Sequence, residues 1–137
     1  MKAAVIGLGK IGLPIAVTIA DAGIEVVGGD ASKRVVDDVN NGREPFPGEP
    51  GLVEGIIRSL DSGLLSATTI NSEASSGADV IVVIVPMYVD ENGVPDYSIL
   101  ESASRDIGAV LTPGQTVIYE TTLPVGATRS RLAPVLE

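Results

Sequence analysis

A glycine-rich turn near the N-terminus is the first feature of the sequence that could carry chemistry. Gly7, Gly9 and Gly12 have the G-x-G-x-x-G spacing, directly after one apolar run and directly before another. Backbone N–H groups and the positive end of a helix bind phosphate groups at such turns. Gly7 would allow a sharp turn, Gly9 the approach of a pyrophosphate, and Gly12 close packing of helix on strand. We therefore predict that this turn, including Lys10 and Ile11 between its last two glycines, binds the pyrophosphate of a dinucleotide.

Asp30 is the second candidate, because it ends the next apolar run at residues 24–29. Its carboxylate can accept hydrogen bonds from both hydroxyls of the adenosine ribose, and its charge would repel the extra phosphate of NADP, so we predict NAD as the cofactor. Arg34 is predicted to bind the cofactor too, over the adenine or at the pyrophosphate, although Arg34 and Lys33 could also accept a phosphate. The alternative is a glycine turn without a ligand and an Asp30 that caps the helix beginning near Ser32.

The elements that must position these residues alternate between strand and helix along the chain. Short apolar runs bounded by turn residues predict strands, and longer runs with apolar residues at helical spacing predict helices. This alternation is typical of an α/β fold, a Rossmann-type doubly wound parallel sheet, truncated here to about five strands in the order 3-2-1-4-5. Prolines and glycines predict a loop over residues 44–51. The predicted strands are residues 2–7, 24–29, 68–70, 79–85 and 115–121, and the predicted helices are residues 11–22, 32–40, 52–60, 96–111 and 126–136.

The composition restricts the classes of partner. The 137 residues suffice for one domain, and with 45% apolar but only 3% aromatic residues they favour an aliphatic core around a buried parallel sheet. A formal net charge of −9 would repel nucleic acids and anionic membranes, and no apolar run is long enough to span a bilayer. Because cysteine and histidine are absent, the chain offers no disulfide, no usual structural zinc site, no thiol nucleophile and no imidazole base. We expect a cytoplasmic protein without a metal site.

Four stretches of the sequence together resemble one enzyme family. Their order and their spread over nearly the whole chain resemble the N-terminal domain of the UDP-glucose/GDP-mannose dehydrogenase family, which includes UDP-N-acetylmannosamine dehydrogenases. The resemblance implies an NAD-dependent oxidoreductase that oxidises a nucleotide-sugar alcohol to a carboxylate with two NAD, in polysaccharide biosynthesis. The stretches are GLGKIGLP at residues 7–14, residues 42–52 ending in EPGL, VPMYVDENGVPD at residues 85–96, and ETTLPVGAT at residues 120–128.

The resemblance also implies roles for residues at the ends of the fourth and fifth strands. Val85 and Pro86 would lie beside the dinucleotide. Thr122 would lie near both the nicotinamide and the reacting carbon, as a catalytic and cofactor-binding residue that orients substrate or water. Ligands of open α/β sheets do bind at this edge of the sheet. The alternative for Thr122 is a hydroxyl that caps the next helix or bonds to local backbone.

The sequence departs from the family pattern at two places near the predicted cofactor site. Lys10 stands where the family commonly has an aromatic residue, and Met87 and Tyr88 stand where Thr-Pro usually follows Val-Pro. Tyr88 is therefore either a packing residue or a ligand contact.

The family's second domain has no counterpart in this sequence. Family members continue through a sixth strand, a long central helix and a second α/β domain, which carries the nucleophilic cysteine, its lysine and asparagine helpers and most nucleotide-sugar contacts. We expect residues 1–137 to be an incomplete N-terminal domain that binds NAD without turnover. Because the sixth strand would cover the strand at 115–121, we also expect a homo-oligomer formed through that edge or the last helix.

Two other functions remain open at this point. Relatives of 6-phosphogluconate and 3-hydroxyisobutyrate dehydrogenases begin with a similar turn, but more often have an Asn-Arg-Thr-like pattern where this chain has Asp30, Ala31 and Ser32. That difference, with the EPGL stretch at residues 49–52, favours the nucleotide-sugar enzymes. A non-catalytic NAD-sensing module would have the same sequence features.

Overall fold

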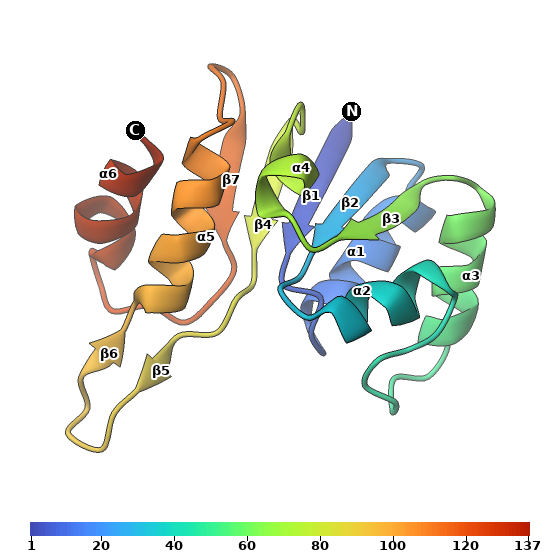
Figure 1. Ribbon diagram of the computed structural model, residues 1–137, viewed down its shortest axis with the longest axis horizontal. Coiled ribbons are helices and arrows are strands. Elements are labelled where there is room, and N and C mark those ends of the chain that lie inside the picture. Colours follow the sequence, from blue (N-terminus) through green and yellow to red (C-terminus); the bar gives the residue numbers. More distant parts are fainter.

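A parallel sheet forms the centre of the molecule, and the computed structural model describes all residues from 1 to 137 (Figure 1). The 5-stranded sheet has the order β3-β2-β1-β4-β7. With β7 as the fifth strand, this is the predicted order, and the Rossmann-type doubly wound fold is confirmed. The strands are β1 (Lys2–Ile6), β2 (Glu25–Gly29), β3 (Leu65–Thr68), β4 (Val80–Val83) and β7 (Thr116–Tyr119).

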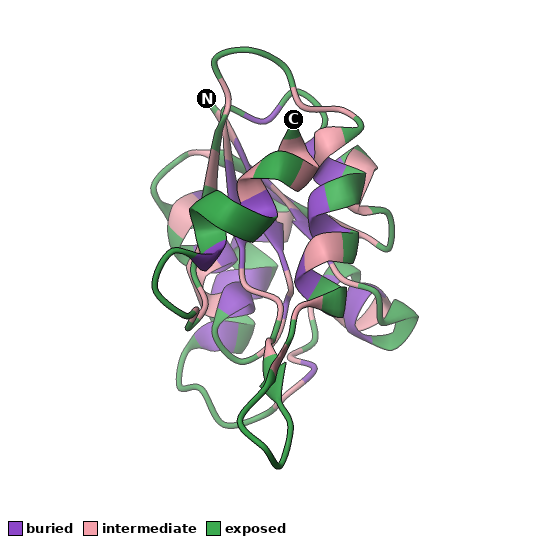
Figure 2. Ribbon diagram, turned by 90° about the vertical axis from the view of Figure 1, so that its left-hand side faces the viewer, coloured by how far each residue is buried: buried purple, intermediate pink, exposed green.

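Helices cover both faces of this sheet, so that its strands are buried between two layers (Figure 2). One face packs against α1 (Gly12–Asp21), α2 (Lys33–Asn40) and α3 (Leu52–Asp61), and we call this side the α1 core. The other face packs against α4 (Asn71–Ser75), α5 (Ser98–Gly108) and the π-helical turn η1 (Thr128–Leu132), which continues into α6 (Ala133–Leu136). This side is the α5 core. Strand β1 contributes to both, because its side chains alternate between the faces.

The third predicted strand, at residues 68–70, is wrong in position. Strand β3 begins at Leu65, which is buried and pairs with Val26 of β2. It ends at Thr68, whose hydroxyl accepts a hydrogen bond from the amide of Ile70 and turns the chain toward α4. Helix α4 was not predicted, because its polar residues show no helical pattern of apolar positions.

A small hairpin was also missed. Strands β5 (Tyr88–Val89) and β6 (Pro95–Asp96) pair antiparallel and project from the body of the molecule (Figure 1). The helix predicted at 96–111 therefore begins only at Ser98, whose amide donates to the Asp96 carboxylate. The other predicted elements exist with bounds shifted by a few residues.

The carboxyl ends of the parallel strands lie side by side at one end of the sheet. There the amide of Gly7 donates to the carbonyl of Gly29 at 2.7 Å, and the amide of Ile84 donates to the carbonyl of Ile6 at 2.7 Å. The chain segments that leave β1, β2, β4 and β7 therefore lie next to one another. None of the helices combines the length and the hydropathy of a membrane-crossing segment.

Candidate functional site

The glycine turn lies where β1 gives way to α1, and two of its glycines are required by the fold. Gly7 has a φ of 98°, and a Cβ there would lie 2.9 Å from the carbonyl oxygen of Ile84. At Gly12 a Cβ would lie 1.8 Å from the carbonyl oxygen of Gly7. Any side chain at Gly12 would therefore separate the start of α1 from the end of β1, as the spacing predicts.

Gly9 differs from its neighbours in the turn. Its φ is not positive, and a Cβ added there would meet no atom within 4 Å. The fold itself therefore does not require glycine at this position. The open space instead leaves the backbone accessible to a ligand, and the approach of a pyrophosphate is the role that we predict for Gly9 from the sequence.

The N-terminus of α1 faces this open space without a competing side chain. Its N-cap residue, Ile11, provides no side-chain hydrogen bond, and no acidic residue lies in the first turn. The N–H groups and the partial positive charge of the helix end are therefore open to an anion. Lys10 and Ile11 are both exposed, and 63% of the Ile11 surface is accessible.

Asp30 is tied to the glycine turn. One carboxylate oxygen accepts from the amide of Leu8 at 2.9 Å, and the other accepts from the amide of Ser32 at 2.8 Å. Because each carboxylate oxygen has two lone pairs, both keep capacity to accept a further hydrogen bond. The cap of α2 is Ser32, whose hydroxyl accepts from the amide of Val35 at 3.5 Å, so the helix-cap alternative for Asp30 is wrong.

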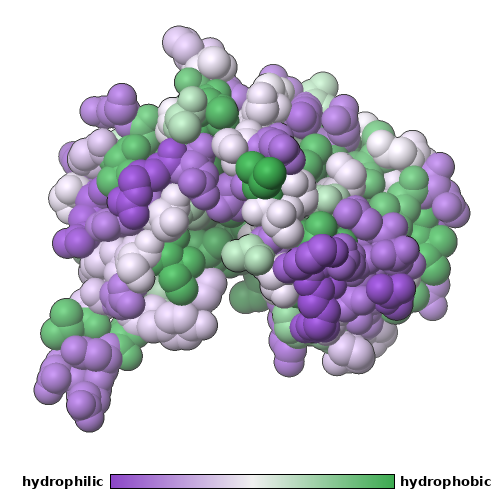
Figure 3. Space-filling model, viewed as in Figure 1, coloured by the Kyte–Doolittle hydropathy of each residue, from purple (hydrophilic) through white to green (hydrophobic).

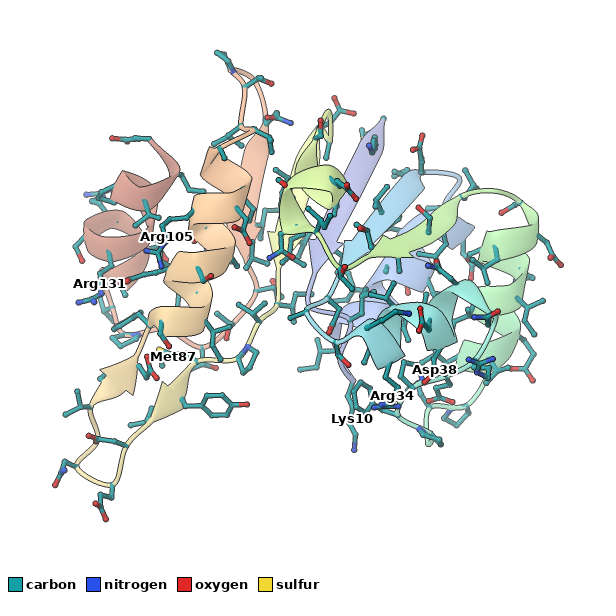
Figure 4. All side chains as sticks on the ribbon, in the orientation of Figure 1. Lys10, Arg34, Asp38, Met87, Arg105 and Arg131 are labelled. Carbon is teal, nitrogen blue, oxygen red and sulfur yellow. The ribbon has the colours of Figure 1, made fainter.

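Both cations that follow Asp30 are engaged in ion pairs. Lys33 lies 2.6 Å from Asp37, and Arg34 lies 3.2 Å from Asp38. The Arg34 guanidinium also donates to the carbonyl of Pro45 at 3.3 Å and lies 5.4 Å from the centre of the Phe46 ring. Figure 4 shows Arg34 and Asp38 close together on α2. Arg34 thus holds the loop after α2 in place, and its contact with a cofactor stays a prediction.

Three cavities surround the turn, and Gly9 lines each of them. The Asp30 cavity, of about 460 Å³, is bordered by Asp30, Val85 and Pro86. The Thr122 cavity, of about 640 Å³, lies between the turn and the end of β7. The loop cavity, of about 200 Å³, lies beneath the loop at residues 44–49. In Figure 3 the surface is notched between the projecting hairpin and the hydrophilic region over α2.

Thr122 lies in the Thr122 cavity together with Glu120 and Thr121. Its hydroxyl makes no hydrogen bond within the chain, and η1 begins at Thr128, where the N-cap residue Ala127 provides no side-chain cap. The structure therefore does not use Thr122 as a helix cap. Val85 and Pro86 border both this cavity and the Asp30 cavity.

Tyr119 is a residue of the site that sequence reasoning missed. It lines the Thr122 cavity, and its hydroxyl lies 2.5 Å from that of Ser104 on α5. The Ser104 hydroxyl is buried and donates to the carbonyl of Leu100, so the tyrosine donates to the serine. Burial raises the pKa of Tyr119.

The residues after Val-Pro lie away from the cavities. Met87 packs against the α5 core, whereas Tyr88 lies in β5 and is 62% exposed. Tyr88 is thus not a packing residue of the core. The Asp30 cavity is completed instead by residues that carried no sequence signal: Asn71 on α4, and Ser98, Ile99 and Ser102 on α5.

Comparison with known proteins agrees with this geometry. A family model described as the UDP-glucose/GDP-mannose dehydrogenase family, NAD binding domain, matches residues 1–137. The UDP-N-acetyl-D-mannosamine dehydrogenase of Campylobacter jejuni is 40% identical over 128 residues, which are 93% of this chain and 30% of that protein.

Solved structures of similar proteins have the same fold. A GDP-mannose dehydrogenase from Pseudomonas aeruginosa superposes with a TM-score of 0.93 at 30% identity, over 100% of this chain and 32% of that one. A UDP-D-ManNAc dehydrogenase from Pyrococcus horikoshii superposes with a TM-score of 0.92 at 36% identity, with the same coverage. The chain thus spans about a third of the length of these proteins. The open glycine turn and the strand order agree with the family match over all residues. The predicted cofactor, NAD, is confirmed by that match. The chain therefore belongs to the UDP-glucose/GDP-mannose dehydrogenase family, as its NAD-binding domain.

Proposed function

We propose that this domain serves a nucleotide-sugar 6-dehydrogenase, which oxidises the alcohol of a UDP-sugar to the acid with two molecules of NAD. The relative from Campylobacter, named a UDP-N-acetyl-D-mannosamine dehydrogenase, supports this substrate class. The enzyme would act in the cytoplasm as a homo-oligomer and supply sugar acids for polysaccharide biosynthesis.

The open space beside Gly9 is the observation on which the proposal rests. The pyrophosphate would bind to the turn from Gly7 to Gly12, and Asp30 would bind the adenosine ribose in the Asp30 cavity. Bound NAD supplies the acceptor for a hydride. The Thr122 cavity is large enough for the nicotinamide end, with Val85 and Pro86 between the two halves.

Two side chains complete the proposed site. The unbonded hydroxyl of Thr122 would orient substrate or water beside the nicotinamide. Arg34 would reach the adenine or the pyrophosphate by exchanging its present partners, Asp38 and the Pro45 carbonyl, for the cofactor.

The chain by itself is proposed to bind NAD without turning over. It contains no cysteine, so no thiol of this chain can hold the aldehyde between the two hydride transfers. We assign residues 1–137 to the N-terminal part of the enzyme, because the family match covers this range.

Calorimetric titration with NAD and NADP tests the cofactor site. We expect the chain to bind NAD more tightly than NADP. The Gly9→Val substitution should weaken NAD binding about ten- to hundredfold by filling the space of the pyrophosphate, and Gly9→Ala should have an intermediate effect. Because a Cβ at this position meets no atom, circular dichroism and thermal unfolding of both variants should match those of the unaltered chain.

Wild-type NAD affinity in the folded Gly9→Val variant would contradict the proposed site. Incubation of the purified chain with NAD and either UDP-glucose or UDP-N-acetylmannosamine tests the second claim. We expect no formation of NADH, and sustained formation would show that the chain turns over alone.

A further inference from the structure

The charges around the glycine turn support an inference that rests on the proposed function and deepens it. Lys10 is the sole cationic side chain among the residues that line the three cavities meeting at Gly9. The acidic residues there are Asp30 in the Asp30 cavity, Glu120 in the Thr122 cavity, and Glu44 and Glu49 in the loop cavity. A dinucleotide therefore meets a predominantly negative rim on a chain of net charge −9.

Lys10 differs from the nearest other cations because it forms no ion pair. Lys33 is paired with Asp37, and both Arg34 and Arg43 are paired with Asp38. Lys10 is exposed, and Figure 4 shows its side chain extending away from the ribbon into solvent. Its ammonium group is therefore available to a ligand at little cost in broken contacts.

Lys10 lies between two cavities whose linings differ in charge. Lys10 lines the loop cavity together with Glu44 and Glu49, and it also lines the Thr122 cavity together with Gly9 and Gly12. Rotation of its flexible side chain is enough to pass between them, with no change of backbone. The lining of the loop cavity is acidic, whereas the Thr122 cavity borders the turn that is proposed to bind the pyrophosphate.

We propose that the Lys10 ammonium pairs with the pyrophosphate of the bound dinucleotide, and that the negative charges of Glu44 and Glu49 in the adjoining loop cavity compete with the pyrophosphate for this ammonium without forming an ion pair. The backbone N–H groups of the turn provide the shape of the phosphate site, and Lys10 provides its compensating charge. An aromatic residue at this position cannot supply that charge, so the mode of binding is specific to sequences with a cation here. Glu44 and Glu49 reduce the affinity for the dinucleotide, because their charges attract the same ammonium and repel the pyrophosphate.

Titration of NAD at several salt concentrations tests the first part. Lys10→Met should bind NAD about tenfold more weakly at low salt, since a hydrogen bond to a charged group is lost. The affinity of the variant should also fall less with added salt than that of the unaltered chain, because screening acts on the ion pair that it lacks. Lys33→Met is the matched control, because it removes the same charge from a residue outside the three cavities, and its affinity and salt dependence should be those of the unaltered chain.

The Glu49→Gln substitution tests the second part, because no contact of the Glu49 carboxylate holds the loop in place. It should tighten NAD binding about threefold, and it should have no effect in a Lys10→Met background. Unchanged affinity in Glu49→Gln would overturn the competition with Glu44 and Glu49.

Wild-type affinity and salt dependence in Lys10→Met would overturn the role of Lys10 while leaving NAD binding intact. Absence of NAD binding by the unaltered chain would overturn the proposed function instead, so the two failures are distinguishable.

Discussion

At the scale of the residue, Asp30 connects two parts of the cofactor site. Its carboxylate accepts hydrogen bonds from the amides of Leu8 in the glycine turn and Ser32 after β2. The same group is placed to accept the ribose hydroxyls in the Asp30 cavity. In the proposed site, the recognition of the ribose and the shape of the glycine turn would therefore depend on one side chain.

Asp30→Asn tests this double dependence. The amide NH₂ would face a backbone N–H donor where a carboxylate oxygen now accepts, so the turn should loosen as the ribose contact weakens. We expect NAD affinity to fall about tenfold and the preference for NAD over NADP to shrink, both measured by titration calorimetry. Asp37→Asn is the control, because its carboxylate contacts only Lys33, and NAD affinity should not change. An Asp30→Asn variant with unchanged NAD affinity would remove Asp30 from the site.

The sequence predicted the residues of the turn better than the residues around it. The spacing of Gly7, Gly9 and Gly12 encodes a local geometry, so their roles in the fold could be read without tertiary information. The contacts of Arg34 with Pro45 and Phe46 join segments whose approach depends on how α2 and its loop pack. Asn71 and Ser102 reach the Asp30 cavity only through the arrangement of α4 and α5, which no local pattern specifies.

At the scale of the element, a hydrogen bond between side chains fixes the end of β7 against α5. Tyr119 donates to the buried hydroxyl of Ser104, which in turn donates to the carbonyl of Leu100. The residues that follow Tyr119, among them Thr122, line the cavity proposed for the nicotinamide. The Tyr119 contact therefore sets the position of that wall.

Tyr119→Phe should lower the free energy of unfolding by about 1 kcal/mol at neutral pH, because one hydrogen bond is lost. Burial raises the pKa of Tyr119 above its ordinary value of 10.0, so the folded state retains the phenolic proton more strongly than the unfolded state. The stabilisation that the protonated Tyr119 provides is complete below pH 10 and is lost as the pH rises through the raised pKa. Denaturant titrations at neutral and strongly alkaline pH should therefore show that the free energy of unfolding falls more for the unaltered chain than for the variant. Equal losses would contradict the buried, protonated Tyr119.

Elements were predictable where a repeating apolar pattern persists over several residues. The runs of β1, β2 and β4 and the amphipathic pattern of α3 were located to within a few residues. Strand β3 was misplaced, because its alternating polar residues resemble the turn that follows it. The hairpin of β5 and β6 depends on a turn in which the Asp90 carboxylate accepts from the amides of Asn92 and Val94, within a segment too short for a periodic signal.

At the scale of the whole molecule, β3 and β7 are the two edge strands of the sheet, and the β7 edge is the one that concerns self-association. Strand β7 pairs with β4 on one side only, and Ile118 in its centre is 41% exposed. An open strand edge beside an exposed apolar side chain favours pairing with another chain. The expected homo-oligomer would use this surface.

Ile118→Lys should therefore reduce self-association, because a charge at this edge opposes pairing. Sedimentation velocity over a range of protein concentrations measures the effect. Val53→Lys introduces the same charge at an exposed site on α3, away from β7, and should leave association as it is. A clean monomer of the unaltered chain at high concentration would count against this use of the edge.

The position of β1 between the two cores has a consequence for the cost of binding. Ala3 and Val5 point into the α1 core, and Ala4 and Ile6 point into the α5 core, so packing on opposite faces immobilises the strand that leads into the phosphate turn. The ordering of that backbone is completed when the domain folds. A dinucleotide that binds at the proposed site would meet a turn that is already ordered, and little free energy would be lost to conformational restriction of the protein.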